Sequence, residues 1–290
     1  MKDQACNFLG LEGAQSDPAS AAYAVLPVPY EGTVSYEAGT AAAPAAILEA
    51  SQQVELLDEE LGAEFVSAGV ATLPAVEPAD DPAGQMRRVR RAAQPIVAAG
   101  KFLLALGGEH SITVPLVEVC AERHGPISVL QVDAHADLRD SYGGSGHSHA
   151  CVMRRVLEIT DRICQVGIRS FSLEEQTACP ARVAEFITPG LIARDARWID
   201  RVLAKLGERV YVTVDMDGLD PSIAPGVGTP EPGGLTWQQV TGLLRRLCAE
   251  RQVVAADIVE ARPIPPSHVT EFVAARLAYK IIAYTQAADR

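Results

Sequence analysis

The chain of 290 residues lacks several features that mark common classes of protein. It contains no CxxC pair, so neither a thiolate zinc site nor a thioredoxin-like motif is predicted. No run of about 18 apolar residues occurs, and we therefore expect no transmembrane helix. The start, MKDQACNFLG, has neither the apolar core nor the cleavage site of a secretory signal. Six cysteines in a chain too long to need a disulfide framework favour a reduced, cytoplasmic protein.

Basic residues are scarce relative to acidic ones. The chain has 25 Lys and Arg against 37 Asp and Glu, a formal net charge of −12. Binding to nucleic-acid phosphates needs clustered Lys and Arg, and the basic run RRVRR (87–91) is typical of a solvated helix face. We expect neither a nucleic-acid nor a membrane partner. A hydrophobic content of 48% excludes intrinsic disorder.

Short apolar runs alternate with longer helical stretches along the whole chain. Several runs are apolar throughout, which indicates parallel strands covered on both faces. Helices are expected after Pro44, Pro82, Ser111 and Thr236, and over residues 267–286. No linker or repeat divides the chain, so the pattern predicts one α/β domain over residues 1–290. The candidate strands are Tyr23–Val28, Val54–Leu57, Phe102–Leu106, Ile127–Val132, Ile163–Ile168, Glu185–Thr188, Val210–Asp215 and Val253–Val259.

Histidines and aspartates gather directly after three of the apolar runs. Asp133, His135 and Asp137 alternate along one segment, so on an extended strand end their side chains share a face. The carboxyl ends of strands line the ligand crevice of an open α/β sheet. We therefore expect the three segments to form one site. Its candidate residues are His110, Asp133, His135, Asp137, Asp215 and Asp217.

Four carboxylates at one edge of a sheet repel one another unless cations neutralise them. Six oxygen and nitrogen ligands exceed what a single ion with an open position needs, and they suit two ions roughly 3.5–4 Å apart. A ligand set without thiolate favours Mn²⁺ over Zn²⁺. Such a centre activates water at neutral pH. The sequence thus predicts a binuclear metal hydrolase.

Several motifs together resemble the ureohydrolase superfamily of arginases and agmatinases, and are closest to its prokaryotic agmatinase-like branch. These motifs are GGEHS (107–111), DAHAD (133–137), SHA (148–150), VDMDGLDPSIAPGVGTP (214–230) and DIVE (257–260). Residues 28–51 also resemble the family's N-terminal segment. The resemblance implies a three-layer α/β/α fold with a mostly parallel eight-stranded sheet, two Mn²⁺ ions, and a homotrimer or homohexamer.

The same resemblance assigns roles to single residues. The six candidate residues above would be the metal ligands. Glu260 would hold the substrate guanidinium through a charge-assisted pair, Asp137 would pass a proton to the leaving amine, and His149 would contact the substrate side and export a proton. Glu109 stands where many relatives have Asp, and we expect it to act outside the ligand set. His147 is expected to be an exposed loop histidine.

The substrate tail is open from sequence. Arginases place an asparagine where this chain has Arg139, which disfavours arginine and makes Arg139 a candidate tail-binding residue. Agmatine, cleaved to putrescine and urea in polyamine biosynthesis, is the first candidate. N1-aminopropylagmatine, guanidinobutyrate and arginine are the alternatives.

Two other functional classes are alternatives for this sequence. A binuclear metallophosphatase should carry a GNH-type loop, and the chain has none. An inactive assembly or regulatory subunit should have lost ligands, whereas all the candidate residues are present.

Overall fold

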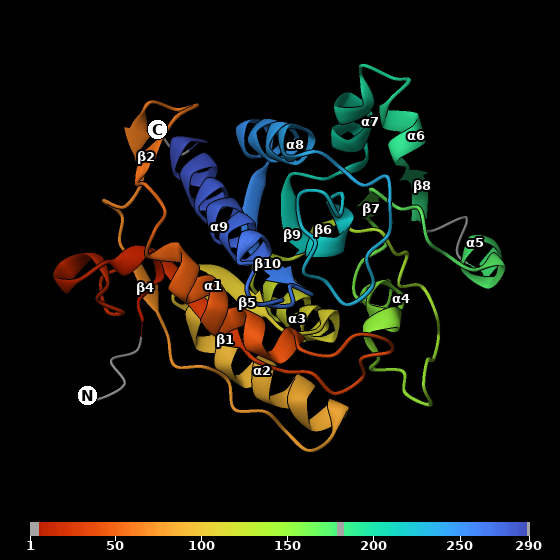
Figure 1. Cartoon of the computed structure of the whole chain (residues 1–290), viewed down its shortest axis with the longest axis horizontal. Coiled ribbons are helices and arrows are strands. Elements are labelled where there is room, and N and C mark those ends of the chain that lie inside the picture. Colours follow the sequence, from red (N-terminus) through yellow and green to blue (C-terminus); the bar gives the residue numbers. More distant parts are fainter. Residues whose placement is uncertain (1–5, 179–182, 289–290) are drawn as a thin grey trace.

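The computed structural model describes residues 6–178 and 183–288 and is built on a single eight-stranded parallel sheet (Figure 1). Its strand order is β4-β1-β5-β10-β9-β6-β7-β8. The strands are β1 (Tyr23–Val28), β4 (Val70–Thr72), β5 (Phe102–Gly107), β6 (Ser128–Val132), β7 (Ile163–Val166), β8 (Val183–Ile187), β9 (Arg209–Asp215) and β10 (Gln252–Val259). The order is not sequential, so strands distant in the chain become neighbours at the centre of the sheet.

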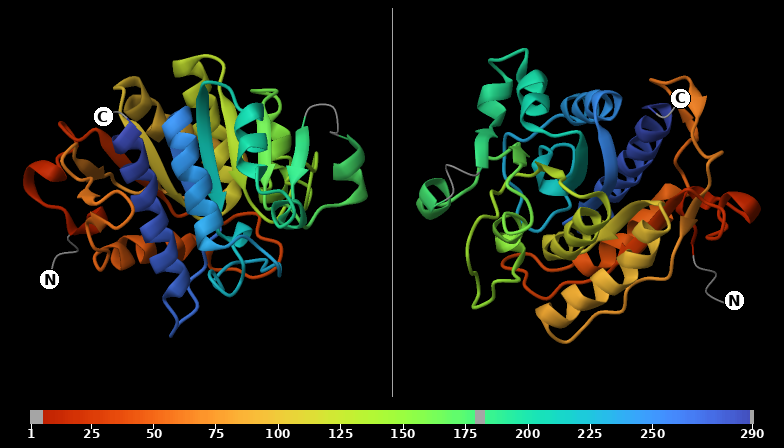
Figure 2. Two further views of the ribbon diagram at one scale, coloured as in Figure 1. Left: turned by 90° about the horizontal axis from the view of Figure 1, so that it is seen from above. Right: turned by 180° about the vertical axis from the view of Figure 1, so that it is seen from behind.

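Helices cover both faces of the sheet, because successive strand residues point to opposite sides. Val25 packs into one hydrophobic cluster and the adjacent Ala24 into the other. One face carries α1 (Ala43–Ser51), α7 (Trp198–Lys205), α8 (Trp237–Glu250) and α9 (Val269–Ala288). The other carries α2 (Pro82–Ala98), α3 (Thr113–His124) and α4 (Val152–Val156). The left view of Figure 2 shows the sheet between the two layers.

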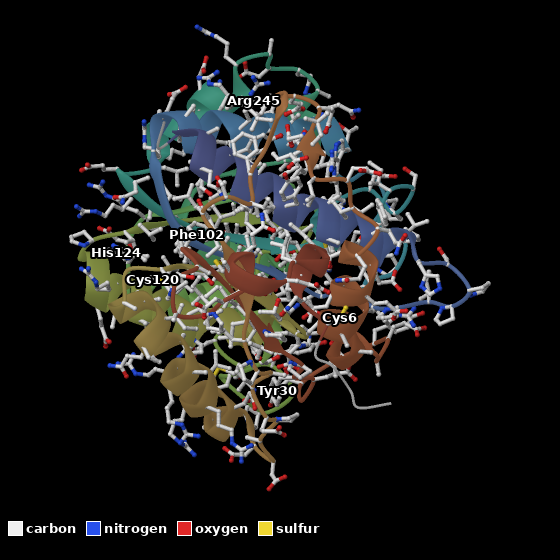
Figure 3. The ribbon with its side chains drawn as sticks, turned by 90° about the vertical axis from the view of Figure 1, so that its left-hand side faces the viewer. Cys6, Tyr30, Phe102, Cys120, His124 and Arg245 are labelled. Carbon is white, nitrogen blue, oxygen red and sulfur yellow. The ribbon has the colours of Figure 1, made fainter. Side chains whose placement is uncertain are left out.

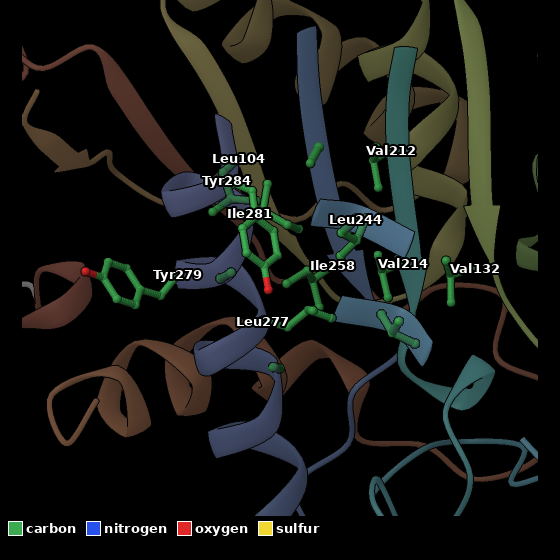
Figure 4. Packing of buried hydrophobic residues seen from close by; sticks show 14 of the residues in the cluster. Leu104, Val132, Val212, Val214, Leu244, Ile258, Leu277, Tyr279, Ile281 and Tyr284 are labelled. Carbon is green, nitrogen blue, oxygen red and sulfur yellow. The ribbon is translucent and has the colours of Figure 1, made fainter. Parts of the chain in front are cut away.

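The larger core lies between the sheet and helices α8 and α9 (Figure 4). Val212 and Ile258 face it from neighbouring strands, while Leu244 and Ile281 enter from the helices. All four side chains are buried. This packing holds the central strands in a fixed register and therefore fixes where their carboxyl ends point.

Local sequence accounts for several helix boundaries. Asp81 accepts a hydrogen bond from Gly84 N at the start of α2, with Pro82 in the first turn, as predicted. Thr236 and Gln239 form a reciprocal capping box at the start of α8. The final helix begins at Val269, close to the predicted start. Two further short helices, α5 (Leu173–Ala178) and α6 (Pro189–Ile192), flank β8.

One predicted strand is wrong. Residues Val54–Leu57 do not join the main sheet; only Leu57 enters a strand, β2 (Leu57–Asp58), which pairs antiparallel with β3 (Ala63–Glu64). Val54 is buried by packing against the core rather than by strand pairing. The edge strand is instead β4, whose three residues are too few to show a periodic pattern.

Two expectations concern the whole chain. Among the described helices, none combines the length and apolarity needed to cross a membrane. None of the five cysteines in the described part of the chain forms a disulfide with another of them, and Cys179 lies outside the described residues.

Candidate metal centre

Four adjacent central strands deliver the predicted site residues to one edge of the sheet. The strands β5, β10, β9 and β6 are consecutive in the sheet. His110 follows β5, Glu260 follows β10, Asp215 ends β9, and Asp133 follows β6. Because all of these strands are parallel, the four side chains meet at their carboxyl ends.

A first group of ligand atoms surrounds His110. Its Nδ1 lies 3.1 Å from Asp137 Oδ2, 3.2 Å from Asp133 Oδ2 and 3.4 Å from Asp215 Oδ2. The imidazole is buried, and this nitrogen makes no hydrogen bond of acceptable geometry. The other ring nitrogen, Nε2, is held by Thr213 Oγ1 at 2.9 Å. A buried nitrogen that faces three carboxylates without a hydrogen bond has the surroundings of a metal ligand.

A second group adjoins the first and shares Asp133 with it. His135 Nδ1 lies 2.9 Å from Asp217 Oδ2 and 3.7 Å from Asp133 Oδ1. Within each group the ligand atoms of His110, Asp133 and Asp137, or of Asp133, His135 and Asp217, lie within 4.8 Å of one another. One oxygen of Asp133 thus faces each group, so this carboxylate could supply a ligand atom to both.

The pKa values of these groups are shifted in the direction expected where several acids crowd together and positive charge is favoured. Burial alone raises the pKa of Asp215 and Asp137, and the neighbouring carboxylates raise it further. Burial opposes a charged His135, yet the charges of Asp217 and Asp133 raise its pKa to about 12. The pKa of His110 is likewise raised well above its usual value by Asp133, Asp137 and Asp215, against its burial. These acids pair with His110 and His135, which supply positive charge only when they are protonated.

Two predicted residues hold strained backbone conformations. Asp137 has a φ of 53° and Glu260 a φ of 60°, in the left-handed region that costs a residue with a Cβ about 1–2 kcal/mol. Glu260 N donates to Gly108 O at 2.8 Å, and His110 N donates to Glu260 Oε1 at 2.7 Å. These bonds keep the Glu260 carboxylate beside the His110 group.

The Glu260 carboxylate lies in surroundings that disfavour its own charge. Its pKa is raised well above the usual value, first by burial and then by the charge of Glu109. Its second oxygen points toward Gly228, where an added Cβ would lie only 4.0 Å away. A cation bound against this carboxylate would relieve that cost.

His149 and Arg139 lie near the cluster but outside both ligand groups. His149 begins the short turn His149–Cys151, which contacts the turn that carries His110, and it is partly exposed. Arg139 lines a cavity of about 210 Å³ together with His135, Asp137 and Glu175. His147 is exposed, as predicted.

Four polar residues that support the cluster were not predicted as part of it: Thr113, Tyr211, Thr213 and Asp257. Thr213 Oγ1 donates to Asp257 Oδ1 at 2.6 Å and thereby accepts from His110 Nε2. Asp257 also accepts from Thr113 Oγ1 and Tyr211 OH. Asp257 belongs to the DIVE motif, and its place in the middle of an apolar strand is a signal that could have singled it out.

Comparison with known proteins decides the family. The model of the arginase family matches residues 21–283. The chain belongs to the arginase family.

Relatives within this family cover most of the chain. It is 41% identical to the N(1)-aminopropylagmatine ureohydrolase of Synechocystis over 92% of this chain and 90% of that protein. It is 34% identical to the agmatinase of Pyrococcus horikoshii, over 92% and 93% of the two chains. Among solved structures, the agmatine ureohydrolase of Thermoplasma volcanium superposes with a TM-score of 0.87 at 35% identity, covering 97% and 94% of the two chains. The predicted arginase-like fold is confirmed.

Proposed function

We propose that this arginase-family chain is a binuclear metal hydrolase that cleaves an amine-tailed guanidine into urea and an amine. The observation that carries the proposal is Asp133, whose two oxygens face two adjacent ligand groups. Agmatine, which yields putrescine and urea, is the first candidate substrate. N(1)-aminopropylagmatine is the second, and it is favoured by relatives of that name at 40–41% identity.

The donor set fits two divalent ions. The first would be held by His110, Asp133, Asp137 and Asp215. The second would be held by Asp133, His135 and Asp217. Carboxylates with imidazole and no thiolate favour Mn²⁺, which we propose as the ion. When bound, such ions would supply an activated water at neutral pH.

The protein's own residues bind the substrate and move protons. Glu260 would pair with the planar guanidinium, and its position is fixed by the hydrogen bond from His110 N. Asp137 would carry a proton on its carboxylate to the leaving amine, a task suited to an acid whose pKa is raised by burial and by Asp133. His149, partly exposed beside the cluster, would pass protons to solvent.

The cavity beside the cluster favours a basic tail. Arg139 Nη2 lies 3.9 Å from Glu175 Oε2, and its guanidinium lies 5.1 Å from the centre of the Tyr142 ring. Glu175 is buried and held in place by Leu138 N and Ser172 N. The charge of Arg139 is therefore already balanced, and an acidic tail would meet Glu175 without a free cation to receive it.

A substrate panel tests this proposal. With Mn²⁺ bound, kcat/KM for urea release from agmatine or N(1)-aminopropylagmatine should exceed that from guanidinobutyrate or arginine by about 100-fold. In Glu175→Gln, Arg139 loses its partner, and relative activity on guanidinobutyrate should rise about tenfold. Arg139→Met, the matched control, should not produce that rise. Preference for guanidinobutyrate in the unaltered protein, or hydrolysis of a phosphate ester without urea release, would overturn the proposal.

We also propose that residues 1–290 act as one domain within a homotrimer or homohexamer in the cytoplasm. The resemblance to ureohydrolases supports the oligomer, and the described cysteines, none of which forms a disulfide with another, support a reducing compartment. Sedimentation velocity of the purified full chain would measure the assembly, and a monomer at micromolar concentration would contradict it.

A further inference from the structure

A buried carboxylate next to the metal cluster organises the loop that follows β1. Glu109 is fully buried between β5 and the turn that carries His110. Its Oε2 accepts hydrogen bonds from Gly32 N at 2.7 Å and Thr33 N at 2.6 Å. Its Oε1 accepts from Thr33 Oγ1 at 2.8 Å and Ser111 Oγ at 2.5 Å. Both oxygens are therefore engaged by two donors each, three of the four from the loop.

The hydroxyl of Thr33 has all its hydrogen-bonding capacity in use. A hydroxyl offers one proton and two lone pairs. The proton goes to the Glu109 carboxylate, which can only accept. One lone pair accepts from the backbone N–H of His149 at 3.0 Å. Only the second lone pair remains for His149 Nδ1, which lies 3.2 Å from the same oxygen.

This count decides which ring nitrogen of His149 carries the proton in the neutral imidazole. Because Thr33 Oγ1 can only accept from Nδ1, the hydrogen must lie on Nδ1. The unprotonated lone pair then lies on Nε2, which is 3.2 Å from Ser35 Oγ. The Ser35 hydroxyl can donate its proton to Nε2, so the contacts of Ser35 and Thr33 indicate the same tautomer of His149.

We propose that Glu109 and Thr33 are positioning residues that hold His149 in the Nδ1–H tautomer and leave Nε2 as its proton-accepting atom. The inference rests on the proposed function only for the use made of that atom. In this proposal Glu109 and Thr33 join the residues that serve the reaction, and the buried Glu109 beside His110 acquires a role. The arrangement parallels other sites in which an acid, acting on a histidine, fixes its tautomer.

Nitrogen NMR on the full chain tests the tautomer directly. The protein is labelled with ¹⁵N-histidine and studied without paramagnetic ions in alkaline buffer, and His149→Asn identifies the resonances. We expect a pyrrole-like Nδ1 and a pyridine-like Nε2. In Thr33→Val the preference should be lost or reversed, while Ser35→Ala, which removes a hydroxyl from the other ring nitrogen, should keep Nδ1–H. A pyridine-like Nδ1 in the unaltered protein, or an unchanged tautomer in Thr33→Val, overturns the proposal.

Kinetics of the Mn²⁺-loaded enzyme supply the second readout. Thr33→Val should lower kcat for urea release about 10- to 100-fold with little change in KM, since proton transfer rather than binding is impaired. Thr33→Ser keeps the hydroxyl and should restore most of kcat. A loss confined to KM, or no rescue by serine, would contradict the positioning role. If no guanidine yields urea, the proposed function fails, and the NMR result still decides the tautomer.

Discussion

The carboxyl ends of the central strands carry crowded acids, whereas the amino ends of β1, β5 and β10 border a cavity of about 490 Å³ with no carboxylate among its described lining residues. That cavity is lined by Lys101, His124 and Arg251. Phe102 and His124, both labelled in Figure 3, line the same cavity. The chain thus gathers acids at one edge of the sheet and bases at the other.

Two of these bases, Lys101 and Arg251, have structural partners. Lys101 Nζ donates to Ala21 O, just before β1. Arg251 donates to Glu250 O at 2.8 Å and to Leu203 O at 2.9 Å, near the ends of α8 and α7. Cations at helix carboxyl ends satisfy exposed carbonyls and interact favourably with the helix dipole. These charges are accounted for by the backbone, so they do not by themselves indicate a ligand.

The acids at the carboxyl ends of the strands have too few cationic partners to balance their charge. Asp133, Asp137 and Asp215 converge on one imidazole nitrogen that makes no proper hydrogen bond. A cluster of like charges therefore indicates a ligand site only where other groups of the protein do not already neutralise those charges. The predictions below test this contrast from both ends.

The largest effect is expected for Asp137→Asn. Loss of this acid removes both a proposed ligand and the proton donor, and urea release should fall about 1,000-fold or more. The metal-free protein should unfold at the same temperature or a higher one, because one of several repelling carboxylates is gone. Urea assays and calorimetry in chelator measure the two quantities. Retained activity would refute the assignment.

A smaller effect is expected in the pH dependence of Mn²⁺ affinity. In the metal-free fold the pKa of His135 is raised to about 12 and that of Asp215 is raised by burial and Asp217, so protons are held where ions would bind. Both raised values stabilise the metal-free fold at low pH, and that contribution is lost as pH rises. Mn²⁺ must displace these protons, and affinity should rise about tenfold per pH unit for each proton released.

Titration calorimetry at three pH values near neutrality, in two buffers of different ionisation enthalpy, would count the protons. The pKa of Asp133 is shifted in the opposite direction. Burial would raise it, but His110 and His135 lower it. It therefore contributes no proton to the count. An affinity independent of pH would show that the cluster is not the ion site.

The smallest effect is expected at the amino edge. Arg251→Met removes hydrogen bonds to two carbonyls and should lower the free energy of unfolding by about 1 kcal/mol. Because these bonds serve the fold and lie far along the strands from the cluster, kcat and KM for urea release should not change. Denaturant unfolding and the urea assay check the two outcomes. A fall in kcat would break the contrast between the two edges.

Much of the fold could be predicted because its elements carry strong local signals. The central strands are apolar throughout, and Pro82 and Thr236 stand at the starts of long helices. Strand Val54–Leu57 was mistaken because a buried loop and a buried strand show the same short apolar pattern. The edge strand β4 escaped prediction because three residues cannot establish a period.

For the candidate site, the ligand residues could be predicted from the sequence, but the residues that support them could not. The ligand residues follow strand ends in the sequence, so the strand pattern predicts that they share one site. Their exact placement did not follow from alternation, because Asp137 has a left-handed φ and Asp217 lies in a short 3-10 turn after β9. The supports do not follow any spacing: Thr33 lies in an irregular loop, and its link to Glu109 and His149 spans 76 and 116 residues. The pairing of Arg139 with Glu175 likewise joins separate loops. Such contacts depend on the tertiary fold, which a single sequence does not display.

The position of β10 has a consequence for biosynthesis. This strand is translated after all six proposed ligands, yet it lies between β5 and β9 in the finished sheet. Until residues 252–259 have been made, the strand that precedes His110 lacks the neighbour that joins it to the strands bearing Asp215 and Asp133. A nascent chain can therefore hold every proposed ligand while the strand that precedes His110 is still not joined to the strands that bear the other ligands. The order of strands delays completion of the His110 group until β10 has been made.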